Sequence, residues 1–175
     1  MADSDLTLVE TVTPELLHDI GVLRIVAWEG AGERPSLAPS EGNVWTDSHD
    51  SHAAHWIYRE DERLVAAARL CIHLEVNDLP DQETYRGIDL PRVFPMASLN
   101  RLVVSPSYRG PRLSPAFDRV RLQYACERGA RASVVVTHLP TRLRDLRRAG
   151  FGVLSQSQYR IVSRAPSFIL VKCLQ

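Results

Sequence analysis

The chain has 175 residues, of which 45% are apolar and 24% are charged. These fractions are close to those of an average globular domain, and they exclude a collagen, a coiled coil and a disordered chain. Twenty-one basic side chains balance twenty-one acidic ones, so the chain lacks the positive charge expected of a protein that binds nucleic acid or an anionic membrane. Small molecules or other proteins are the expected partners.

The cysteines indicate a reduced compartment. Cys71, Cys126 and Cys173 are odd in number and too far apart for a metal-binding pair, which argues against a disulfide framework. Residues 1–8 lack the basic start and apolar run of a secretory signal, and no stretch is long enough to cross a bilayer. A cytoplasmic location is the expectation.

Nearly all basic residues are arginines, and Lys172 is the only lysine. A coding bias explains this preference for arginine better than phosphate recognition does, because the arginines are spread along the chain.

Seven runs have the length and composition of β-strands. They are Leu6–Val12, Ala54–Arg59, Leu64–His73, Ala97–Ser105, Ser133–Thr137, Gln158–Ser163 and Phe168–Cys173. The second and third flank the polar turn at 60–62, which is the pattern of a β-hairpin. The apolar run at 133–137 is expected to lie inside the sheet, covered on both faces.

Three helices are expected between these strands. They begin at Thr13-Pro14, at Ser114-Pro115 and at Thr141, and they end near Gly30, Gly129 and Gly150. Two connections are long: residues 31–51 have the composition of a loop or lid, and residues 75–95 are interrupted by prolines and acids. Such connections are usually functional or partly helical. The order of elements predicts an α/β fold, with residues 1–175 forming a single domain around a mixed sheet of about seven strands flanked by helices.

Residues 101–116, RLVVSPSYRGPRLSPA, join a strand to a helix through a turn rich in Gly and Pro. Such a turn exposes backbone N–H groups at a helix N-terminus, where the unpaired donors and the helix dipole stabilise an anion. The dipole contributes only about 0.3 to 1 kcal/mol, so Arg109 and Arg112 would supply much of the rest. Phosphate is the expected ligand, and an ordinary strand-to-helix turn is the alternative.

This segment resembles the pyrophosphate-binding motif Q/R-x-x-G-x-G/A of the GCN5-related N-acetyltransferases, which follows a strand ending in V-x-P-x-Y-R-G. Residues 104–110, VSPSYRG, match that run, and Ala149-Gly150-Phe151 matches a later signature of the family. The resemblance covers nearly the whole chain and implies the family's fold. It also implies that a CoA thioester is bound by Leu102, Val103, Val104, Arg109, Gly110, Arg112, Leu113 and Ser114.

Three positions depart from that family pattern. Arg112 and Ser114 stand where the motif has Gly and Gly/Ala, and Leu146 stands where many members have a tyrosine that protonates the leaving thiolate. These departures argue more strongly against acetyl-CoA as the donor than against the family's fold.

A narrower resemblance is to the acyl-homoserine-lactone synthases and the N-acyl amino acid synthases, which share this fold and take longer acyl chains from acyl carrier protein or CoA. Their pattern has an arginine and an aromatic residue in the first helix, a D-x-x-D pair in the following loop, and arginines in the third and fourth strands. The matching residues are Arg24, Trp28, Asp47, Asp50, Arg69 and Arg101, and residues 90–95 are similar to the loop before the fourth strand. The resemblance implies that substrate is bound by Arg24, Trp28, Trp45, Asp47, Arg69 and Arg101. The family's glutamate is Ser98 here, which favours simple amide formation over lactone formation.

Alternatives remain for several of these residues. Arg24 and Asp47 could form a surface ion pair, and Trp28, Trp45 and Trp56 could pack in the core or a lid. His138 ends the central strand and is a candidate general base; Asp50 and Ser98 are further candidate catalytic residues. No metal is expected, because the spacing of His49, His52 and His55 matches no established zinc pattern. The residues expected to form a solvated helix face, or a contact with an acidic carrier protein, are Arg142, Arg144, Arg147 and Arg148.

The predicted reaction is attack of a primary amine, on a small molecule or peptide, on the thioester of acyl-CoA or acyl-phosphopantetheine. The sheet should splay where the fourth strand meets the fifth, so that N–H groups near Val103 and Val104 polarise the carbonyl. An amine like that of lysine costs about 4 to 5 kcal/mol to deprotonate at pH 7 and an α-amine about 1, so the lack of an obvious base favours an α-amine.

A plain acetyltransferase and a non-catalytic acyl-CoA-binding protein are the alternatives to this reaction. A long acyl tunnel between the sheet and residues 75–95 would argue against the acetyltransferase. The chain could also form a homodimer.

Overall fold

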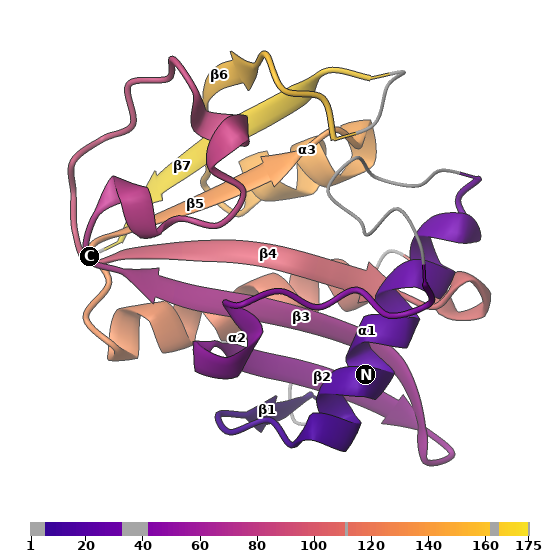
Figure 1. Ribbon diagram of the computed structural model, residues 1–175. Coiled ribbons are helices and arrows are strands. Elements are labelled where there is room, and N and C mark those ends of the chain that lie inside the picture. Colours follow the sequence, from indigo (N-terminus) through magenta and orange to yellow (C-terminus); the bar gives the residue numbers. More distant parts are fainter. Residues whose placement is uncertain (1–5, 33–41, 111, 162–164, 175) are drawn as a thin grey trace.

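The computed structural model describes residues 6–32, 42–110, 112–161 and 165–174, and within them the chain folds around a seven-stranded sheet (Figure 1). The strands are β1 (Thr7–Val9), β2 (Ala54–Glu60), β3 (Arg63–His73), β4 (Met96–Val104), β5 (Ala132–Thr137), β6 (Gly152–Ser157) and β7 (Ser167–Cys173). Their order in the sheet is β1-β2-β3-β4-β5-β7-β6. The neighbours β4 and β5 run parallel, and the other neighbours run antiparallel. This mixed sheet, with β5 inside it, confirms the predicted fold class.

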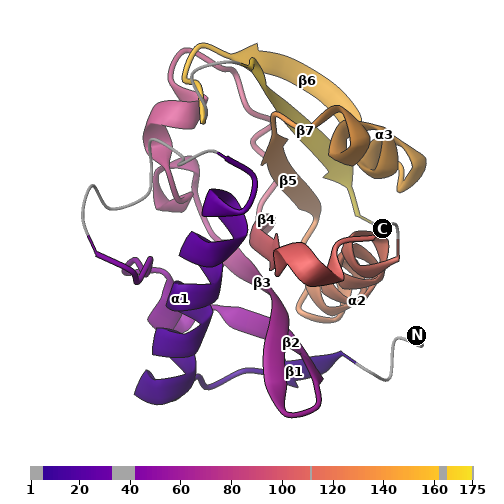
Figure 2. The ribbon, with the colours of Figure 1, turned by 90° about the vertical axis from the view of Figure 1, so that its right-hand side faces the viewer.

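Helices cover both faces of the sheet. The helix α1 (Pro14–Glu29) lies on one face, and α2 (Leu113–Glu127) and α3 (Pro140–Arg148) lie on the other (Figure 2). Successive strand residues point to opposite faces, so Ala67 of β3 packs under α1 while Ala66 and Ala68 pack under α2. Among the described residues, none of the helices has the length and apolar character needed to span a membrane.

The helix ends follow the signals in the sequence. The Thr13 hydroxyl accepts a hydrogen bond from the Leu16 N–H at 3.3 Å, and Pro14 occupies the first turn of α1. At the end of α3, Gly150 has φ +90° and the Phe151 N–H donates to the carbonyl of Leu146. The same two side chains are buried in one core cluster, which is the contact that accompanies this type of glycine cap.

The connection between β3 and β4 completes the cover of the α1 face. It contains two short 3₁₀-helices, η3 (Val76–Asp78) and η4 (Gln82–Tyr85), which confirms that the connection is partly helical. The side chains of Leu79 and Tyr85 pack against Met96 and Val134 of the sheet. This segment therefore forms a second wall beside α1.

The main differences from the predicted elements are in the sixth strand, the start of the second helix and the first strand. The strand expected at 158–163 lies earlier, at β6, because the chain enters it directly after the Gly150 cap; residues 162–164 lie outside the described residues. The helix α2 begins at Leu113, not at Ser114, and Pro115 sits in its first turn, where it has no intrahelical N–H bond to lose. The first strand, β1, is shorter than expected.

The strand β4 separates from β5 halfway along its length. The two strands pair only from Met96 to Leu99, opposite Ala132 to Val135, and the rest of β4 leaves β5 unpaired. The predicted splay is therefore confirmed. Arg101 has φ +52°, and the register with β3 shifts at this point, so β4 carries an extra residue that bends the strand.

A buried arginine of α2 holds the bend in β4. The Arg121 Nη1 donates to the carbonyls of Arg69 at 3.0 Å and Asn100 at 3.4 Å. Its Nη2 donates to Asp118 at 2.8 Å, and its side chain is fully buried. Because the bulge interrupts the ladder, these strand carbonyls need another donor, and Arg121 supplies it.

Candidate active site

A cavity of about 420 Å³ opens where β4 leaves β5. Ser114 of α2 and Arg142 of α3 line one part of it, and Ala27 and Trp28 of α1 line another. The valines of β4 and β5 form apolar walls between them. Beyond these valines the lining becomes polar and includes Arg24, Asp81, Thr84, Ser98, Asn100 and Arg101.

The backbone of β4 presents N–H groups to the gap. The Ser105 N–H donates to the carbonyl of Val65 on β3 at 2.8 Å. Since N–H groups alternate in direction along an antiparallel strand, that of Val104 faces away from β3, toward the cavity. The N–H of Val103, which was expected to share this role, faces β3 instead. Val104 is thus a donor available to a ligand in the gap, and the role of Leu102, which lies at the bulge, stays a prediction.

The turn after β4 leaves a second set of N–H groups free of helical bonds. Arg112 precedes α2 and provides no side-chain cap, so the N–H groups of Leu113 and Ser114 have no intrahelical partner. Nothing lies within 4 Å of where a Cβ on Gly110 would stand, so the bend is not filled by a side chain at this point. The Arg109 guanidinium, expected to bind phosphate, also donates to the carbonyl of Ala27 at the end of α1.

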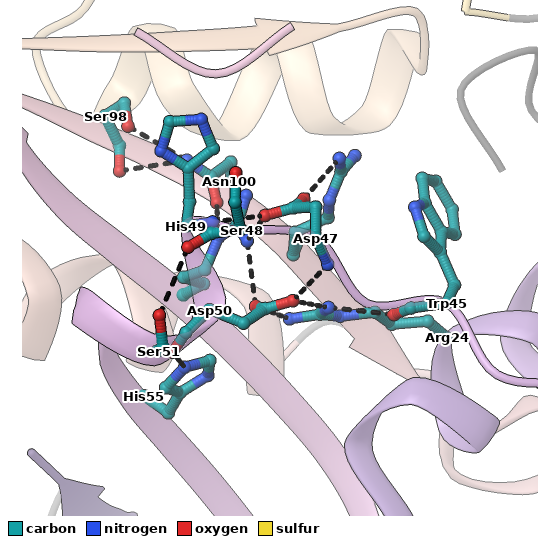
Figure 3. A network of polar contacts seen from close by, with 12 residues as sticks. Arg24, Trp45, Asp47, Ser48, His49, Asp50, Ser51, His55, Ser98 and Asn100 are labelled. Atoms are coloured by element: carbon teal, nitrogen blue, oxygen red, sulfur yellow. Dashed lines mark hydrogen bonds and ion pairs between the residues drawn. The ribbon is translucent and has the colours of Figure 1, made fainter. Parts of the chain in front are cut away.

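The residues expected to bind substrate, apart from Trp28, meet around one buried charged network, part of which Figure 3 shows. Arg24 pairs with Asp50 through two hydrogen bonds of 2.8 and 2.7 Å. Arg69 Nη1 donates to the same carboxylate at 2.8 Å and to Asp47 at 2.6 Å. The side chain of Arg24 is 1% exposed and that of Asp50 is 0% exposed. The surface-pair alternative for Arg24 is therefore wrong.

Arg101 extends this network to the cavity. Its Nη2 donates to Asp47 at 2.9 Å and to Asp81 at 3.1 Å. Its guanidinium carbon lies 4.4 Å from the ring centre of Trp45, a cation–π distance. The network contains three arginines and three aspartates, so its formal charges balance.

The arginines keep the aspartates ionised. Burial favours the neutral form of Asp50, but its hydrogen bonds to Arg24 and the charges of Arg24 and Arg69 outweigh this and hold its pKa well below the usual range. The pKa of Asp47 is lowered in the same way by Arg69 and Arg101. Asp50 does not line the cavity, and its oxygens accept hydrogen bonds from Arg24 and Arg69. This geometry favours a supporting role for Asp50, and the catalytic role expected from the sequence stays a prediction.

A chain of hydrogen bonds runs from Arg69 through three uncharged side chains. Its Nε donates to the Asn100 Oδ1 at 2.5 Å, and the Asn100 Nδ2 donates to the Ser98 Oγ at 2.9 Å. The Ser98 Oγ lies 2.7 Å from the Nε2 of His73. Sequence reasoning missed Asn100 and His73. Alternation along β4 could have placed Asn100 beside Ser98, whereas His73 required the register of β3 on β4.

The other candidates lie elsewhere. His138 stacks on Trp28, with ring centres 5.3 Å apart, and both line the cavity; the role of His138 as a base stays a prediction. Trp56 packs in the core against Tyr124. Arg142 is not part of a solvated face, because it pairs with Asp118 and lines the cavity. The arginines that do form an exposed face are Arg144, Arg147 and Arg148.

The histidines around the aspartate pair do not form a metal site. The His55 Nε2 lies 2.9 Å from the backbone oxygen of Asp50. In the part of the chain that the structure describes, no three His, Cys, Asp or Glu side chains are grouped so as to hold a metal ion.

Comparison with known proteins places this geometry in a fold. No protein-family model and no curated protein matches the sequence. Among solved structures, FeeM, an N-acyl amino acid synthase from uncultured soil microbes, has a TM-score of 0.66 at 14% identity, covering 96% of this chain and 94% of that one. A polyamine N-acetyltransferase of Drosophila melanogaster has a TM-score of 0.69 at 14% identity, and the match covers 97% of this chain and 100% of that one. The CoA-dependent acyl-homoserine lactone synthase BjaI also has a TM-score of 0.69, at 16% identity, and the match covers 97% of this chain and 83% of that one. The chain has the fold of the GCN5-related N-acyltransferases.

Proposed function

We propose that the protein is an N-acyltransferase that moves an acyl group longer than acetyl from a CoA or carrier-protein thioester to a primary α-amine. The observation that carries this proposal is the cavity at the point where β4 leaves β5. It joins the unpaired N–H groups at the start of α2 to the charged network, and the β4 donor Val104 lines the path between them.

The donor would enter the gap from the α2 end. Its phosphate groups accept hydrogen bonds from the N–H groups of Leu113 and Ser114. The pantetheine arm lies in the gap that β5 leaves open, where Val104 offers its N–H group to the ligand in place of a neighbouring strand. In this position the thioester carbonyl accepts this hydrogen bond.

Acyl transfer then needs no covalent enzyme intermediate. The amine nitrogen attacks the thioester carbon, negative charge develops on the carbonyl oxygen, and a β4 N–H stabilises it. Collapse of this tetrahedral intermediate breaks the C–S bond and releases the amide and the thiol. Holding both reactants in one cavity supplies the entropic part of the acceleration.

The depth of the cavity favours a donor longer than acetyl. The lining continues past the gap to Pro80, Thr84 and Tyr85, beneath the connection between β3 and β4, and an acetyl group would leave this space empty. The similar solved structures include an N-acyl amino acid synthase and an acyl-homoserine lactone synthase bound to isopentyl-CoA, which supports a longer chain and a CoA donor.

A substrate screen tests this proposal. We expect decanoyl-CoA to exceed acetyl-CoA about tenfold or more in kcat/KM when each is offered with the twenty α-amino acids, with thiol release and amide mass as readouts. Preference for acetyl-CoA would establish a plain acetyltransferase. Binding of decanoyl-CoA without amide formation from any amino acid or polyamine would establish a non-catalytic protein.

A matched pair of variants tests the β4 donor. Val104→Pro removes the N–H that faces the gap without removing a ladder bond, and we expect kcat to fall about 100-fold, the scale seen when one such donor is lost. Val104→Ala keeps the N–H, and its kcat should remain close to that of the unsubstituted protein. Equal losses in the two variants would contradict the role of this N–H.

A further inference from the structure

The hydrogen-bond chain at Ser98 has a fixed direction. Arginine can only donate, so the Arg69 Nε sets the Asn100 side chain with its oxygen toward Arg69 and its Nδ2 toward Ser98. The Ser98 Oγ therefore accepts one hydrogen bond from Asn100. Its own hydrogen remains to be given elsewhere.

His73 offers an acceptor for that hydrogen. A neutral imidazole has one N–H and one lone pair. With the N–H on Nδ1, the lone pair of Nε2 faces the Ser98 hydroxyl, whose oxygen lies 2.7 Å away.

This direction leaves Ser98 with one unused lone pair. A serine hydroxyl has one hydrogen and two acceptor positions; the hydrogen goes to His73 and one position to Asn100. Ser98 lines the cavity beside Asn100 and Arg101. The residue can thus accept a proton from a ligand at this place while passing its own to His73.

We propose that Ser98 and His73 form a proton relay for the amine, with Ser98 as the catalytic residue that touches the substrate and His73 as the group that holds the proton. This inference rests on the proposed N-acyltransferase function and names its base. The 2.7 Å between the Ser98 hydroxyl oxygen and the His73 Nε2 is within the hydrogen-bond reach that transfer of a proton between them requires.

The proton balance of the step is complete. When the amine nitrogen bonds to the thioester carbon, the nitrogen becomes positively charged and must lose a proton. Ser98 Oγ accepts this proton as its own hydrogen moves to His73 Nε2. The C–S bond breaks, and the thiolate takes a proton from the imidazolium through Ser98 or solvent, which restores the pair.

The surroundings keep His73 neutral before the reaction. Burial is the main cause that lowers the pKa of His73 to about 4, and the facing His49 and Arg69 lower it further against the opposing effect of Asp78. The imidazole is therefore neutral throughout the neutral pH range, and it holds the Ser98 hydrogen only transiently, while the amine reacts.

Kinetics with decanoyl-CoA and an equimolar mixture of the twenty α-amino acids test the relay. We expect Ser98→Ala to lower kcat about 100-fold, the lower end of the range for general base catalysis, with KM for decanoyl-CoA unchanged. Ser98→Thr keeps the hydroxyl and should retain most activity. His73→Gln keeps a hydrogen-bond acceptor and removes the proton acceptor, so it should lose as much as Ser98→Ala and provides the test if that variant does not fold.

Two further measurements separate a relay from a structural role. The ratio of unsubstituted to Ser98→Ala kcat should shrink from pH 7 to pH 9, because hydroxide replaces the missing base; a structural role gives a constant ratio. Ser133→Ala removes another fully buried serine, on β5, and should leave kcat unchanged.

Unchanged kcat in Ser98→Ala and His73→Gln, in an active protein, would overturn the relay alone. Absence of amide formation by the unsubstituted protein would overturn the proposed function and the relay together.

Discussion

Asp50 is the most deeply buried carboxylate of the charged network, and it accepts hydrogen bonds from both Arg24 and Arg69. We expect Asp50→Ala to lower the free energy of unfolding at pH 7 by about 3 to 5 kcal/mol, since it leaves the buried Arg24 guanidinium without its counter-ion and leaves Arg69 with Asp47 alone. Chemical denaturation measures this loss. Asp19→Asn, on the exposed side of α1, is the control and should change stability by less than about 0.5 kcal/mol.

The same carboxylate predicts a dependence of stability on pH. The pKa of Asp50 in the folded chain lies below its ordinary value of 3.8. Its contribution is therefore fully present above about pH 4 and is lost as the pH falls further, because protonation then favours the unfolded chain. Asp50→Asn should show a shallower decline in unfolding free energy below pH 4. Parallel declines in the two proteins would contradict this assignment.

Sequence reasoning identified most residues of this network but not its pairing. Arg24, Asp47, Asp50, Arg69 and Arg101 were all expected in one site because of the resemblance to the acyl-homoserine-lactone and N-acyl amino acid synthases. Which arginine meets which aspartate depends on how residues 44–50 lie across α1 and β3, and no spacing in the sequence fixes that path. His73 joins only through strand register, so its contact with Ser98 could not be anticipated.

The contact between α1 and the turn after β4 is the element-scale feature that shapes the cavity. A Cβ on Gly30 would lie 2.3 Å from the Cγ of Pro106, a rigid ring. We expect Gly30→Ala to push the end of α1 away from this turn and to lower stability by about 1 to 3 kcal/mol, the usual cost of overpacking. It should also weaken CoA binding, measured by calorimetry, because Arg109 is held by Ala27 of the same helix end.

Gly152→Ala is the matched control for this contact. A Cβ there meets nothing closer than a backbone oxygen at 3.8 Å, so stability and CoA binding should both be retained. If Gly30→Ala also retained both, the packing of α1 on the turn would not control the cavity.

Elements with strong end signals were predictable, and those without were not. Threonine, proline and glycine marked α1 and the ends of α2 and α3, because each residue type satisfies or tolerates a particular backbone position. The strand β6 carries largely exposed side chains and little apolar alternation. The more apolar residues after it therefore drew the prediction to the wrong segment.

At the scale of the whole molecule, the sheet of the described residues has two halves, which four residue pairs between β4 and β5 join. A donor that fills the gap beside β4 should therefore stabilise the fold. At 100 times the dissociation constant, binding contributes about 2.7 kcal/mol, which corresponds to a rise in Tm of about 5 to 10 °C for a chain of this size. Thermal unfolding with equal concentrations of CoA, acetyl-CoA and decanoyl-CoA should show the largest shift for decanoyl-CoA. Equal shifts for the two acylated donors would argue against a deep acyl site.

Lys172 gives the molecule a built-in probe. It is the only lysine of the chain, it lies on β7, and its Nζ donates to the carbonyl of Ala149 at 2.7 Å, just after α3. An amine-directed dye would therefore have a single side chain to modify, and that side chain is occupied whenever α3 is docked. The labelling rate at Lys172 would report how often this helix end detaches from the sheet, without any engineered tag.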